Sequence, residues 1–342
     1  MQPKNVFLTG GAGFCGSRLT PQLLELGYNV TVFDTLFFGK DFLPLDHPNL
    51  KVIQGDIRDA EAIKEHAKGC DTFVSLACIS NDASFELDED LSTSINLEAF
   101  EPMVKAAKEA GVKRFVYASS SSVYGVSESP DVTEDHPLVP VSLYNEYKGK
   151  CEPILNSYGD DDFTVVTFRP ATVCGYGPRL RLDLSVNILT NHAITNDKIT
   201  VFGGSQMRPN LHIQDYCDAV KMFMTAPREK IHQDVFNVGF QNMSIMDLAE
   251  LVKKVVLEEF PDKGDIDIVT TPTDDIRSYH INSDKVKKVL GFEPKHSIED
   301  AIRDLCKAFK EGKIPNSMDD DNYYNIRTIK KLVASEQLRN RA

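Results

Sequence analysis

The stretch "TGGAGFCG", residues 9–16, decides the fold of this chain. It follows the apolar run "NVFL" and precedes a segment with helical periodicity, so Gly10, Gly13 and Gly16 form a GxxGxxG turn between an expected strand and an expected helix. Glycines at such a turn allow a tight bend and bring the backbone close to a pyrophosphate on the helix N-terminus. The pattern alone is weak, because many glycines only make turns.

Asp34 makes this motif more specific. It stands 18 residues after Gly16, at the end of the second expected strand, "NVTVFD". A carboxylate at that position accepts hydrogen bonds from the adenosine ribose hydroxyls and repels a 2′-phosphate. Together the two features predict a dinucleotide site that favours NAD over NADP.

Short β-rich runs alternate with amphipathic, helix-like segments through the first half of the chain. This alternation predicts an α/β fold with a doubly wound parallel sheet, whose strands are buried on both faces. One helix is expected over residues 97–110, with Gly111 as its C-terminal cap. The expected strands lie in "NVFLTG", "NVTVFD", "KVIQGD", "TFVSLA", "RFVYAS" and "FTVVTFRP".

From about residue 175 the regular alternation of strands and helices gives way to mostly helical segments, which predicts a smaller, mostly helical second domain. Helices are expected in "RLRLDLSVNILTNHAI", "HIQDYCDAVKMFMTA" and "SIMDLAELVKKVVLEEF", and a strand in "ITVFGG". The segment after Pro315 is expected to be weakly structured or a surface extension. The predicted division is a dinucleotide-binding domain over 1–174 with 211–238 returning to it, a substrate domain over 175–210 and 239–315, and a tail over 316–342.

Composition narrows the possible partners. The 38 Lys and Arg residues against 51 Asp and Glu residues give a net charge of -13, which argues against nucleic acid and anionic membranes. An anionic ligand must then be held locally, by single arginines, backbone N–H groups or a helix N-terminus. The seven cysteines show no CxxC spacing, so we expect a reducing, cytoplasmic location, no disulfide framework and no metal site.

The segment "YNEYK" carries Tyr144 and Lys148 at i and i+4, which places both side chains on one helix face. Ser142 is a plausible N-cap, so Tyr144 falls in the first helical turn. The helix dipole and the nearby ammonium are expected to lower the pKa of the phenol toward neutrality. A phenol tuned in this way can act as a general base.

The motifs together resemble the extended short-chain dehydrogenase/reductase superfamily, in particular its nucleotide-sugar epimerases and dehydratases. The resemblance covers nearly the whole chain, and it implies a Rossmann fold, NAD as cofactor and a nucleoside-diphosphate sugar as substrate. It also implies a homodimer, for which helices over 98–111 and 147–156 are the candidates. The motifs that carry it are the glycine turn with Asp34, "GDIRD", "LAC", "SINLEAF", "ASSSSVYG", "YNEYK" and "RPATV".

The resemblance implies that Ser120, Tyr144 and Lys148 are the catalytic residues. Ser120 would hydrogen-bond the sugar oxygen while Tyr144 takes its proton, and Lys148 would hold the nicotinamide ribose. The implied cofactor contacts are Gly10, Gly13, Phe14, Cys15, Gly16, Asp34, Asp56, Ile57, Leu76, Ala77, Cys78, Asn96, Ala118, Ser119, Tyr144, Lys148 and Pro170. The implied substrate contacts are Ser80, Asn81, Ser120, Ser121, Ser122, Thr172, Arg208 and Arg277, with the two arginines on the diphosphate.

The residue types at positions 121 and 122 help to distinguish among the possible reactions. The 4,6-dehydratases of this family carry acidic groups at these positions, and a serine cannot remove the proton next to a ketone unaided. The serine run is instead similar to that of 4-epimerases. Dehydration, decarboxylation and 4-ketoreduction stay as alternatives, and a non-enzymatic NAD-sensing module is less favoured because all three catalytic groups are present.

Five further positions are considered without assigning them a catalytic role. Many relatives carry Asn where this chain has Thr172, and His where it has Ser75, so the resemblance leaves the substrate pose open. Cys174 could act as an acid, but a free cysteine is usually a small buried hydrophobe. His136 and His212 are expected to support the site or lie at the surface.

Overall fold

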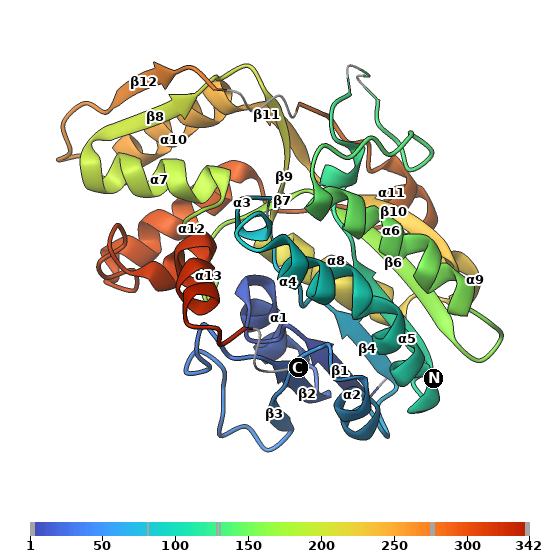
Figure 1. The fold of residues 1–342 in the computed structure, drawn as a ribbon. Coiled ribbons are helices and arrows are strands. Elements are labelled where there is room, and N and C mark those ends of the chain that lie inside the picture. The colour runs from blue at the N-terminus through green and yellow to red at the C-terminus, as the bar shows by residue number, and fades with distance from the viewer. Residues whose placement is uncertain (1–3, 81, 128, 130, 274–277, 339–342) are drawn as a thin grey trace.

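The structure is a computed structural model that describes residues 4–80, 82–127, 129, 131–273 and 278–338 (Figure 1). At its centre is a seven-stranded sheet in the order β10-β6-β5-β4-β1-β2-β3, in which all neighbouring strands are parallel. The predicted doubly wound α/β sheet is therefore confirmed. Its strands are β1 (Asn5–Thr9), β2 (Asn29–Asp34), β3 (Leu50–Gln54), β4 (Thr72–Ser75), β5 (Arg114–Ala118), β6 (Thr164–Pro170) and β10 (Asp234–Val238).

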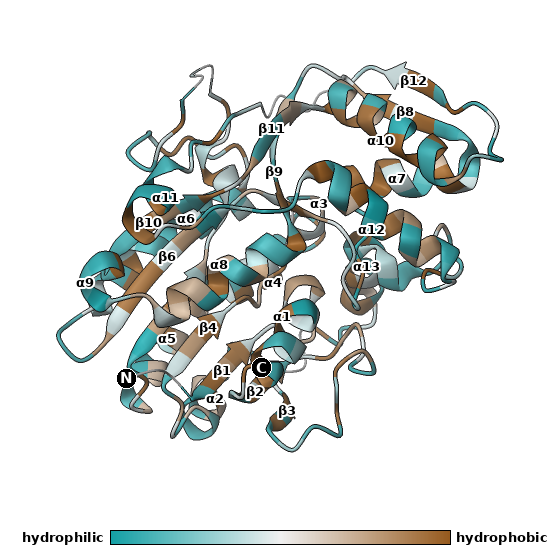
Figure 2. Ribbon diagram, turned by 180° about the vertical axis from the view of Figure 1, so that it is seen from behind, coloured by the Kyte–Doolittle hydropathy of each residue, from teal (hydrophilic) through white to brown (hydrophobic). Residues whose placement is uncertain are grey.

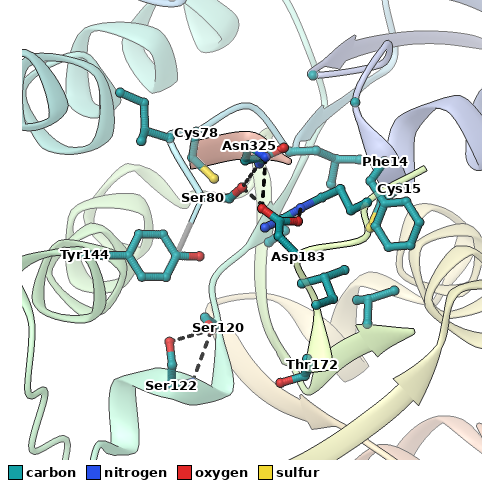
Figure 3. Close-up of a pocket in the computed structure, with 18 of the residues that line it drawn as sticks. Phe14, Cys15, Cys78, Ser80, Ser120, Ser122, Tyr144, Thr172, Asp183 and Asn325 are labelled. Carbon is teal, nitrogen blue, oxygen red and sulfur yellow. Dashed lines mark hydrogen bonds and ion pairs between the residues drawn. The ribbon is translucent and has the colours of Figure 1, made fainter. Parts of the chain in front are cut away.

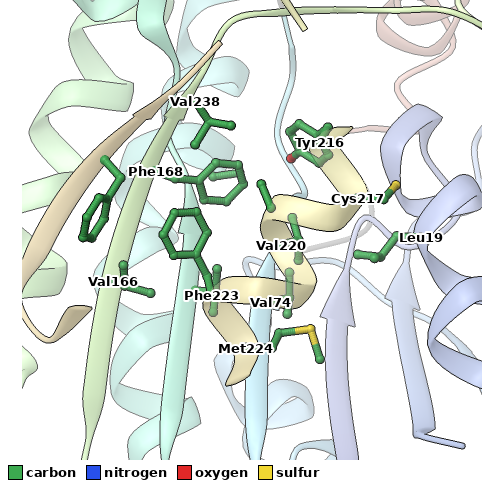
Figure 4. Packing of buried hydrophobic residues seen from close by; sticks show 14 of the residues in the cluster. Leu19, Val74, Val166, Phe168, Tyr216, Cys217, Val220, Phe223, Met224 and Val238 are labelled. Atoms are coloured by element: carbon green, nitrogen blue, oxygen red, sulfur yellow. The ribbon is translucent and has the colours of Figure 1, made fainter. Parts of the chain in front are cut away.

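Helices cover both faces of this sheet, which explains why its strands read as apolar runs. On one face α1 and α8 pack through a core that includes Leu19, Val220 and Phe168 (Figure 4), and on the other α2, α5 and α6 pack through Met103 and Leu155. Figure 2 shows the strands largely in brown, the hydrophobic colour. The helices are α1 (Phe14–Glu25), α2 (Ala60–His66), α5 (Phe100–Glu109), α6 (Leu143–Tyr158) and α8 (Ile213–Thr225).

The helix expected over 97–110 is shorter than predicted. Residues Ser94–Glu98 form a π-helical turn, η1, and α5 begins only at Phe100. Gly111 follows the end of α5 with a φ of 92°, so the predicted glycine closure is confirmed. The short helices of this half are α3 (Asp82–Phe85), α4 (Glu89–Thr93), η2 (Ser121–Tyr124) and α9 (Arg228–Ile231).

The second part of the molecule packs helices against two small sheets, at the top of Figure 1. Helices α7, α10 and α12 share an apolar core with the β8–β12 pair, through residues such as Leu189, Val252, Ile302 and Val201. The elements are β7 (Thr172–Cys174), α7 (Ser185–Asn196), β8 (Lys198–Phe202), β9 (Met207–His212), β11 (Gln241–Ser244), α10 (Ile245–Glu259), β12 (Asp267–Thr271) and α12 (Ile298–Lys310). Helix α11 (Asp284–Leu290) returns to the central sheet and packs beside β10.

The segment after Pro315 is folded, which corrects the expectation of a weakly structured tail. It forms η3 (Asp321–Tyr323) and α13 (Asn325–Ala334), and α13 lies against the body of the molecule (Figure 1). Tyr324 and Ile329 are buried in cores formed by other parts of the chain. The sequence hid this because the polar run "MDDDN" flanks only a few apolar anchors, whose partners are distant in sequence.

Two further observations concern membranes and cysteines. Within the described residues, no helix combines the length and the apolar character that spanning a bilayer requires. All seven cysteines are free thiols in the structure.

A buried ion pair ties the strands to helix α6. The guanidinium of Arg169 on β6 donates two hydrogen bonds to the carboxylate of Glu152 on α6, at 2.9 and 2.6 Å, and a third to the Tyr124 hydroxyl at 2.7 Å. The Ser119 hydroxyl donates to the same carboxylate at 2.7 Å. Burial opposes the charge of Arg169, but the Glu152 carboxylate outweighs it and raises the Arg169 pKa.

Replacing one partner of this pair tests its importance. We expect Glu152→Gln to lower the free energy of unfolding by about 3–5 kcal/mol, because it leaves the buried Arg169 charge without compensation. The measurement is urea unfolding followed by circular dichroism. The matched control is Glu146→Gln on the same helix, which removes only an exposed pair with Lys150 and is expected to change stability little. Equal losses in both variants would contradict the prediction.

Candidate active site

A cavity of about 720 Å³ lies at the carboxyl ends of the central strands. It is lined by residues after β1, β4 and β5, by the first turns of α1 and α6, and by the segment 179–185 from the second part. The strand order reverses between β1 and β4. Open parallel sheets bind ligands at such a switch point, outside the carboxyl ends of the strands.

All but one of the residues predicted to contact the cofactor line this cavity. They are Gly10, Gly13, Phe14, Cys15, Gly16, Asp34, Asp56, Ile57, Leu76, Ala77, Cys78, Ala118, Ser119, Tyr144, Lys148 and Pro170. Asn96 is the exception, because its side chain accepts from the Ile79 N–H and donates to the Ile79 carbonyl, both at 2.9 Å. It shapes the chain after β4, and the cofactor contact of Asn96 stays a prediction.

The predicted substrate residues fall into two groups. Those that line the cavity are Ser80, Ser120, Ser121, Ser122, Thr172 and Arg208. Asn81 and Arg277 lie outside the described residues. The cavity therefore brings together segments from both parts of the chain, as the prediction required.

The glycine turn forms one wall of the cavity. Gly10 has a φ of 73°, and a Cβ there would lie 2.8 Å from the Ala77 nitrogen, so only glycine fits. No side chain caps helix α1 at Gly13, while Phe14 and Cys15 of its first turn line the cavity. The backbone N–H groups in the first turn of α1 can therefore bind an anion, and this wall of the cavity fits the pyrophosphate of NAD.

Asp34 lies at the end of β2, where the motif predicted it. Its carboxylate accepts hydrogen bonds from the Ala12 N–H at 3.0 Å and the Leu36 N–H at 2.8 Å. Burial raises the pKa of Asp34, while these backbone bonds and the Arg179 charge oppose that rise. The carboxylate therefore holds the glycine turn in place and also borders the cavity. The neighbouring Asp56 is engaged by Arg58 at 2.8 Å.

Tyr144 and Lys148 lie on α6 as predicted. The Ser142 hydroxyl accepts from the Asn145 N–H at 3.3 Å, so Ser142 is confirmed as the N-cap and Tyr144 falls in the first turn. The buried Lys148 ammonium donates to the Ala118 carbonyl at 2.9 Å and lies 5.2 Å from the centre of the Tyr117 ring. Lys148 thereby faces the end of β5, and Tyr144 lines the same cavity.

The pKa of Tyr144 runs against the prediction from sequence. Burial, followed by the negative character of Cys78 and Asp82, raises the Tyr144 pKa well above its ordinary value, whereas the Arg181 charge lowers it. The expected lowering was wrong because a local helix position does not report how much solvent the tertiary fold removes. Within the described residues, the cation identified as lowering this pKa is Arg181, on a segment distant in sequence.

The serine run after β5 divides into different roles. Ser119 points to the buried Glu152 carboxylate, whereas Ser120 and Ser122 face the cavity, with their Oγ atoms 2.7 Å apart. Ser120 also caps the turn η2, since its Oγ accepts from the Ser122 N–H at 3.1 Å. In Figure 3 the Tyr144 ring projects toward the space that these two serines border.

The cavity also contains charged residues that no sequence motif indicated. Arg181 Nε donates to Asp183 at 2.9 Å, and its Nη1 donates to Ser80 at 3.1 Å. Arg179 Nη2 donates to the Asn325 side-chain oxygen at 2.6 Å, and the Asn325 side-chain amide donates to Ser80 at 2.9 Å (Figure 3). Two buried arginines and the tail are thus joined at one polar cluster.

This cluster exists because residues 179–184 are not helical, contrary to the prediction. Helix α7 begins only at Ser185. Residues 179–184 form neither helix nor strand and contain bends at Arg179 and over 182–184. Along this segment Leu180 and Leu182 enter an apolar core, while Arg179, Arg181 and Asp183 line the cavity. The alternation in "RLRLD" was visible in the sequence and would have identified these residues.

The remaining candidates are structural. The Cys174 thiol is fully buried, donates to the Leu211 carbonyl at 3.5 Å and has a pKa that burial raises to about 12. His212 caps α8 by accepting from the Gln214 N–H at 3.0 Å, and the His136 ring packs edge-on against Tyr124. In the described part of the chain, no three His, Cys, Asp or Glu side chains group as a metal site.

Comparison with known proteins agrees with this geometry. The chain is 30% identical to the low-salt glycan biosynthesis protein Agl12 of Haloferax volcanii over 307 residues, which cover 87% of this chain and 96% of the relative. It is 28% identical to the dTDP-D-glucose 4,6-dehydratase of Homo sapiens over 346 residues, which cover 96% of this chain and 94% of the relative.

A solved structure and a family match complete the comparison. The UDP-N-acetylglucosamine 4-epimerase of Methanobrevibacter ruminantium M1, in complex with UDP-N-acetylmuramic acid, superposes with a TM-score of 0.80 at 25% identity, covering 91% of this chain and 100% of that one. Residues 6–239 match the NAD dependent epimerase/dehydratase family. The chain therefore belongs to this family of NAD-dependent enzymes, within the extended short-chain dehydrogenase/reductases that its motifs resemble.

Proposed function

We propose that this chain is a nucleotide-sugar epimerase that transiently oxidises C4 of a nucleoside-diphosphate sugar. The observation that carries the proposal is that the acids around the cavity are already engaged. Among the described residues that line it, the carboxylates belong to four aspartates and no glutamate. They are Asp34 with backbone N–H groups, Asp56 with Arg58, Asp82 with the Ser142 hydroxyl, and Asp183 with Arg181 and the Asn325 N–H.

The partners of these carboxylates bear on the reaction, because dehydration requires a carboxylate that is free to exchange protons with the sugar. A 4,6-dehydratase must remove a proton next to the C4 ketone and protonate the leaving hydroxyl. The positions beside Ser120 where that acid is expected hold Ser121 and Ser122. Epimerisation needs neither group, because the same phenol can take and return the hydroxyl proton.

Three side chains, Tyr144, Ser120 and Lys148, have separate roles in this proposed reaction. Tyr144 takes the proton of the C4 hydroxyl while Ser120 donates a hydrogen bond to the same oxygen. NAD supplies the hydride acceptor and, in its oxidised form, a positive charge, and it is regenerated in each cycle. Lys148 orients the nicotinamide ribose. Because burial raises the Tyr144 pKa, its phenolate depends on nearby cations, of which Arg181 is one. Tyr144 returns the proton after the keto sugar has presented its other face.

The substrate is proposed to be held by residues from both parts of the chain. Arg208 binds the diphosphate, and Ser80 and Thr172 contact the sugar; all three line the cavity. We also propose a homodimer through helices over 98–111 and 147–156 and a cytoplasmic location. The family resemblance supports the homodimer, and the free cysteines support the location.

A second candidate function is 4,6-dehydration. The observation that favours it is the 28% identity to a human dTDP-D-glucose 4,6-dehydratase over nearly the full length of both chains. If it were correct, Asp82 would have to leave its Ser142 partner to serve as the acid. The solvent-isotope experiment below separates the two functions.

The role of Tyr144 is tested by removing its hydroxyl. We expect Tyr144→Phe to reduce kcat by about 10²- to 10⁴-fold, the usual contribution of a general acid–base group, while NAD stays bound. The measurement is turnover of UDP-, GDP-, dTDP- and CDP-sugars together with nucleotide released on denaturation. Tyr147→Phe is the matched control, since Tyr147 lies on the same helix and packs against Phe85. Full turnover by Tyr144→Phe would exclude the mechanism.

The class of reaction is tested by turnover in D₂O, read by mass spectrometry. We expect a product with the mass of the substrate and no deuterium on carbon, because the hydride removed from C4 returns to C4. The human 4,6-dehydratase serves as the positive control for loss of one water and for deuterium incorporation. The same signature from this chain would show that it is a dehydratase, and a steady change in nicotinamide absorbance would show that it is a ketoreductase.

A further inference from the structure

Arg179 is a buried cation that forms no salt bridge within the described part of the chain, and the charges of Asp183 and Asp34 attract it from beyond contact distance. Only 4% of the residue is exposed, and no described residue accepts a hydrogen bond from its Nε. Its one side-chain hydrogen bond goes to a neutral group, the Asn325 side-chain oxygen. Burying a guanidinium without an anion is costly, so such a residue points to an anionic ligand.

The nearby Arg181 adds to the positive charge around Arg179. Arg181 is compensated, because Asp183 accepts from it at 2.9 Å, whereas Arg179 lies close enough to Arg181 to be repelled by it. Burial first, and the Arg181 charge second, lower the pKa of the Arg179 guanidinium. A pyrophosphate would supply the charge that Arg179 lacks, and planar guanidinium groups bind phosphate oxygens through paired N–H donors.

The contacts of Arg179 place it on the dinucleotide half of the cavity. Its backbone N–H donates to the Ser17 hydroxyl on α1 at 3.1 Å, and its guanidinium lies 3.6 Å from the centre of the Phe38 ring, beyond the end of β2. Its charge is attracted first by Asp183 and then by Asp34. Ser17, Phe38 and Asp34 lie in the first turn of α1 or at or next to the end of β2. These are the segments that carry the glycine turn and the ribose-binding carboxylate.

We propose that Arg179 binds the pyrophosphate of NAD, which it shares with the N-terminus of α1, and that Asn325 of the tail positions it. NAD would then be held between the glycine turn and an arginine from the second part of the chain. The substrate diphosphate has the same chemistry, but the contacts of Arg179 with Ser17 and Phe38 and its attraction to Asp34 favour the cofactor. The inference does not depend on which reaction the enzyme catalyses.

Asn325 links this arginine to the tail. Besides accepting from Arg179, it donates from its backbone N–H to Asp183 at 3.0 Å and from its amide to Ser80 at 2.9 Å. Arg58 also donates to the Leu338 carbonyl at 2.6 Å, so the end of the described chain is tied to the same half of the cavity. The tail thereby helps to retain the cofactor.

The test is the rate at which NAD leaves the purified holoenzyme, measured by exchange with isotopically labelled NAD. We expect Arg179→Gln to speed NAD loss by about 10- to 100-fold, the range for a hydrogen bond to a charged group. Binding of UDP and dTDP to the holoenzyme, measured by calorimetry, should stay within about twofold. Arg114→Gln is the matched control, because Arg114 is a partly buried arginine that donates to two backbone carbonyls, of Phe223 and Ala226.

Further variants keep the proposal testable if Arg179→Gln does not fold. Arg179→Lys keeps a charge but not the paired donors, and Asn325→Ala removes the positioning group; both should speed NAD loss less than Arg179→Gln. Added to Arg179→Lys, Asn325→Ala should have less than its single effect, because it acts through residue 179. Unchanged NAD exchange in these variants overturns the proposal, and so does weakened UDP or dTDP binding with NAD exchange unchanged, which would assign Arg179 to the substrate diphosphate.

Discussion

The site depends on one close approach of backbone to backbone. The turn after β1 lies so near the chain after β4 that a Cβ on Gly10 would meet the Ala77 nitrogen at 2.8 Å. The Gly10 N–H donates to the Phe33 carbonyl at 3.1 Å, and Asp34 accepts from the Ala12 N–H, so β2 holds the turn from the other side. Three strand ends are thereby locked together at the point where the strand order reverses, and the cavity follows from that junction.

Buried arginines allow this acidic protein to bind an anionic ligand. The net charge is -13, yet among the described residues three arginines, Arg169, Arg179 and Arg181, are buried near the site, two with a carboxylate as partner and one with a neutral amide. Arg169 is neutralised by Glu152 and supports the fold, and Arg181 is neutralised by Asp183 and borders Tyr144. Within the described residues, the side-chain hydrogen bond of Arg179 goes to a neutral group, the Asn325 amide oxygen. An arginine whose charge is neutralised by a carboxylate supports the fold or the site, whereas the arginine without such a carboxylate is the one that we assign to the cofactor.

Tyr144 shows the limit of local reasoning about pKa. Its place in the first turn of α6 was correctly predicted from the Ser142 cap and the i, i+4 spacing to Lys148. The direction of its pKa shift was not, because burial by segments from elsewhere in the chain outweighs the helix start and the ammonium. The Lys148 ammonium instead donates to the Ala118 carbonyl, which fixes it beside β5.

The sequence by itself determined the parallel sheet, the glycine turn with Asp34, and the helix that carries Tyr144 and Lys148, because each depends on a short pattern: apolar runs, glycine spacing or a capped helix start. Sixteen of the 17 predicted cofactor residues line the cavity for the same reason. Only the tertiary structure decided that Asn96 bonds Ile79 and that the tail returns through Asn325 to Arg179. These depend on contacts between segments far apart in the chain, such as the 146 residues that separate Arg179 from Asn325. Local periodicity carries no information about such contacts.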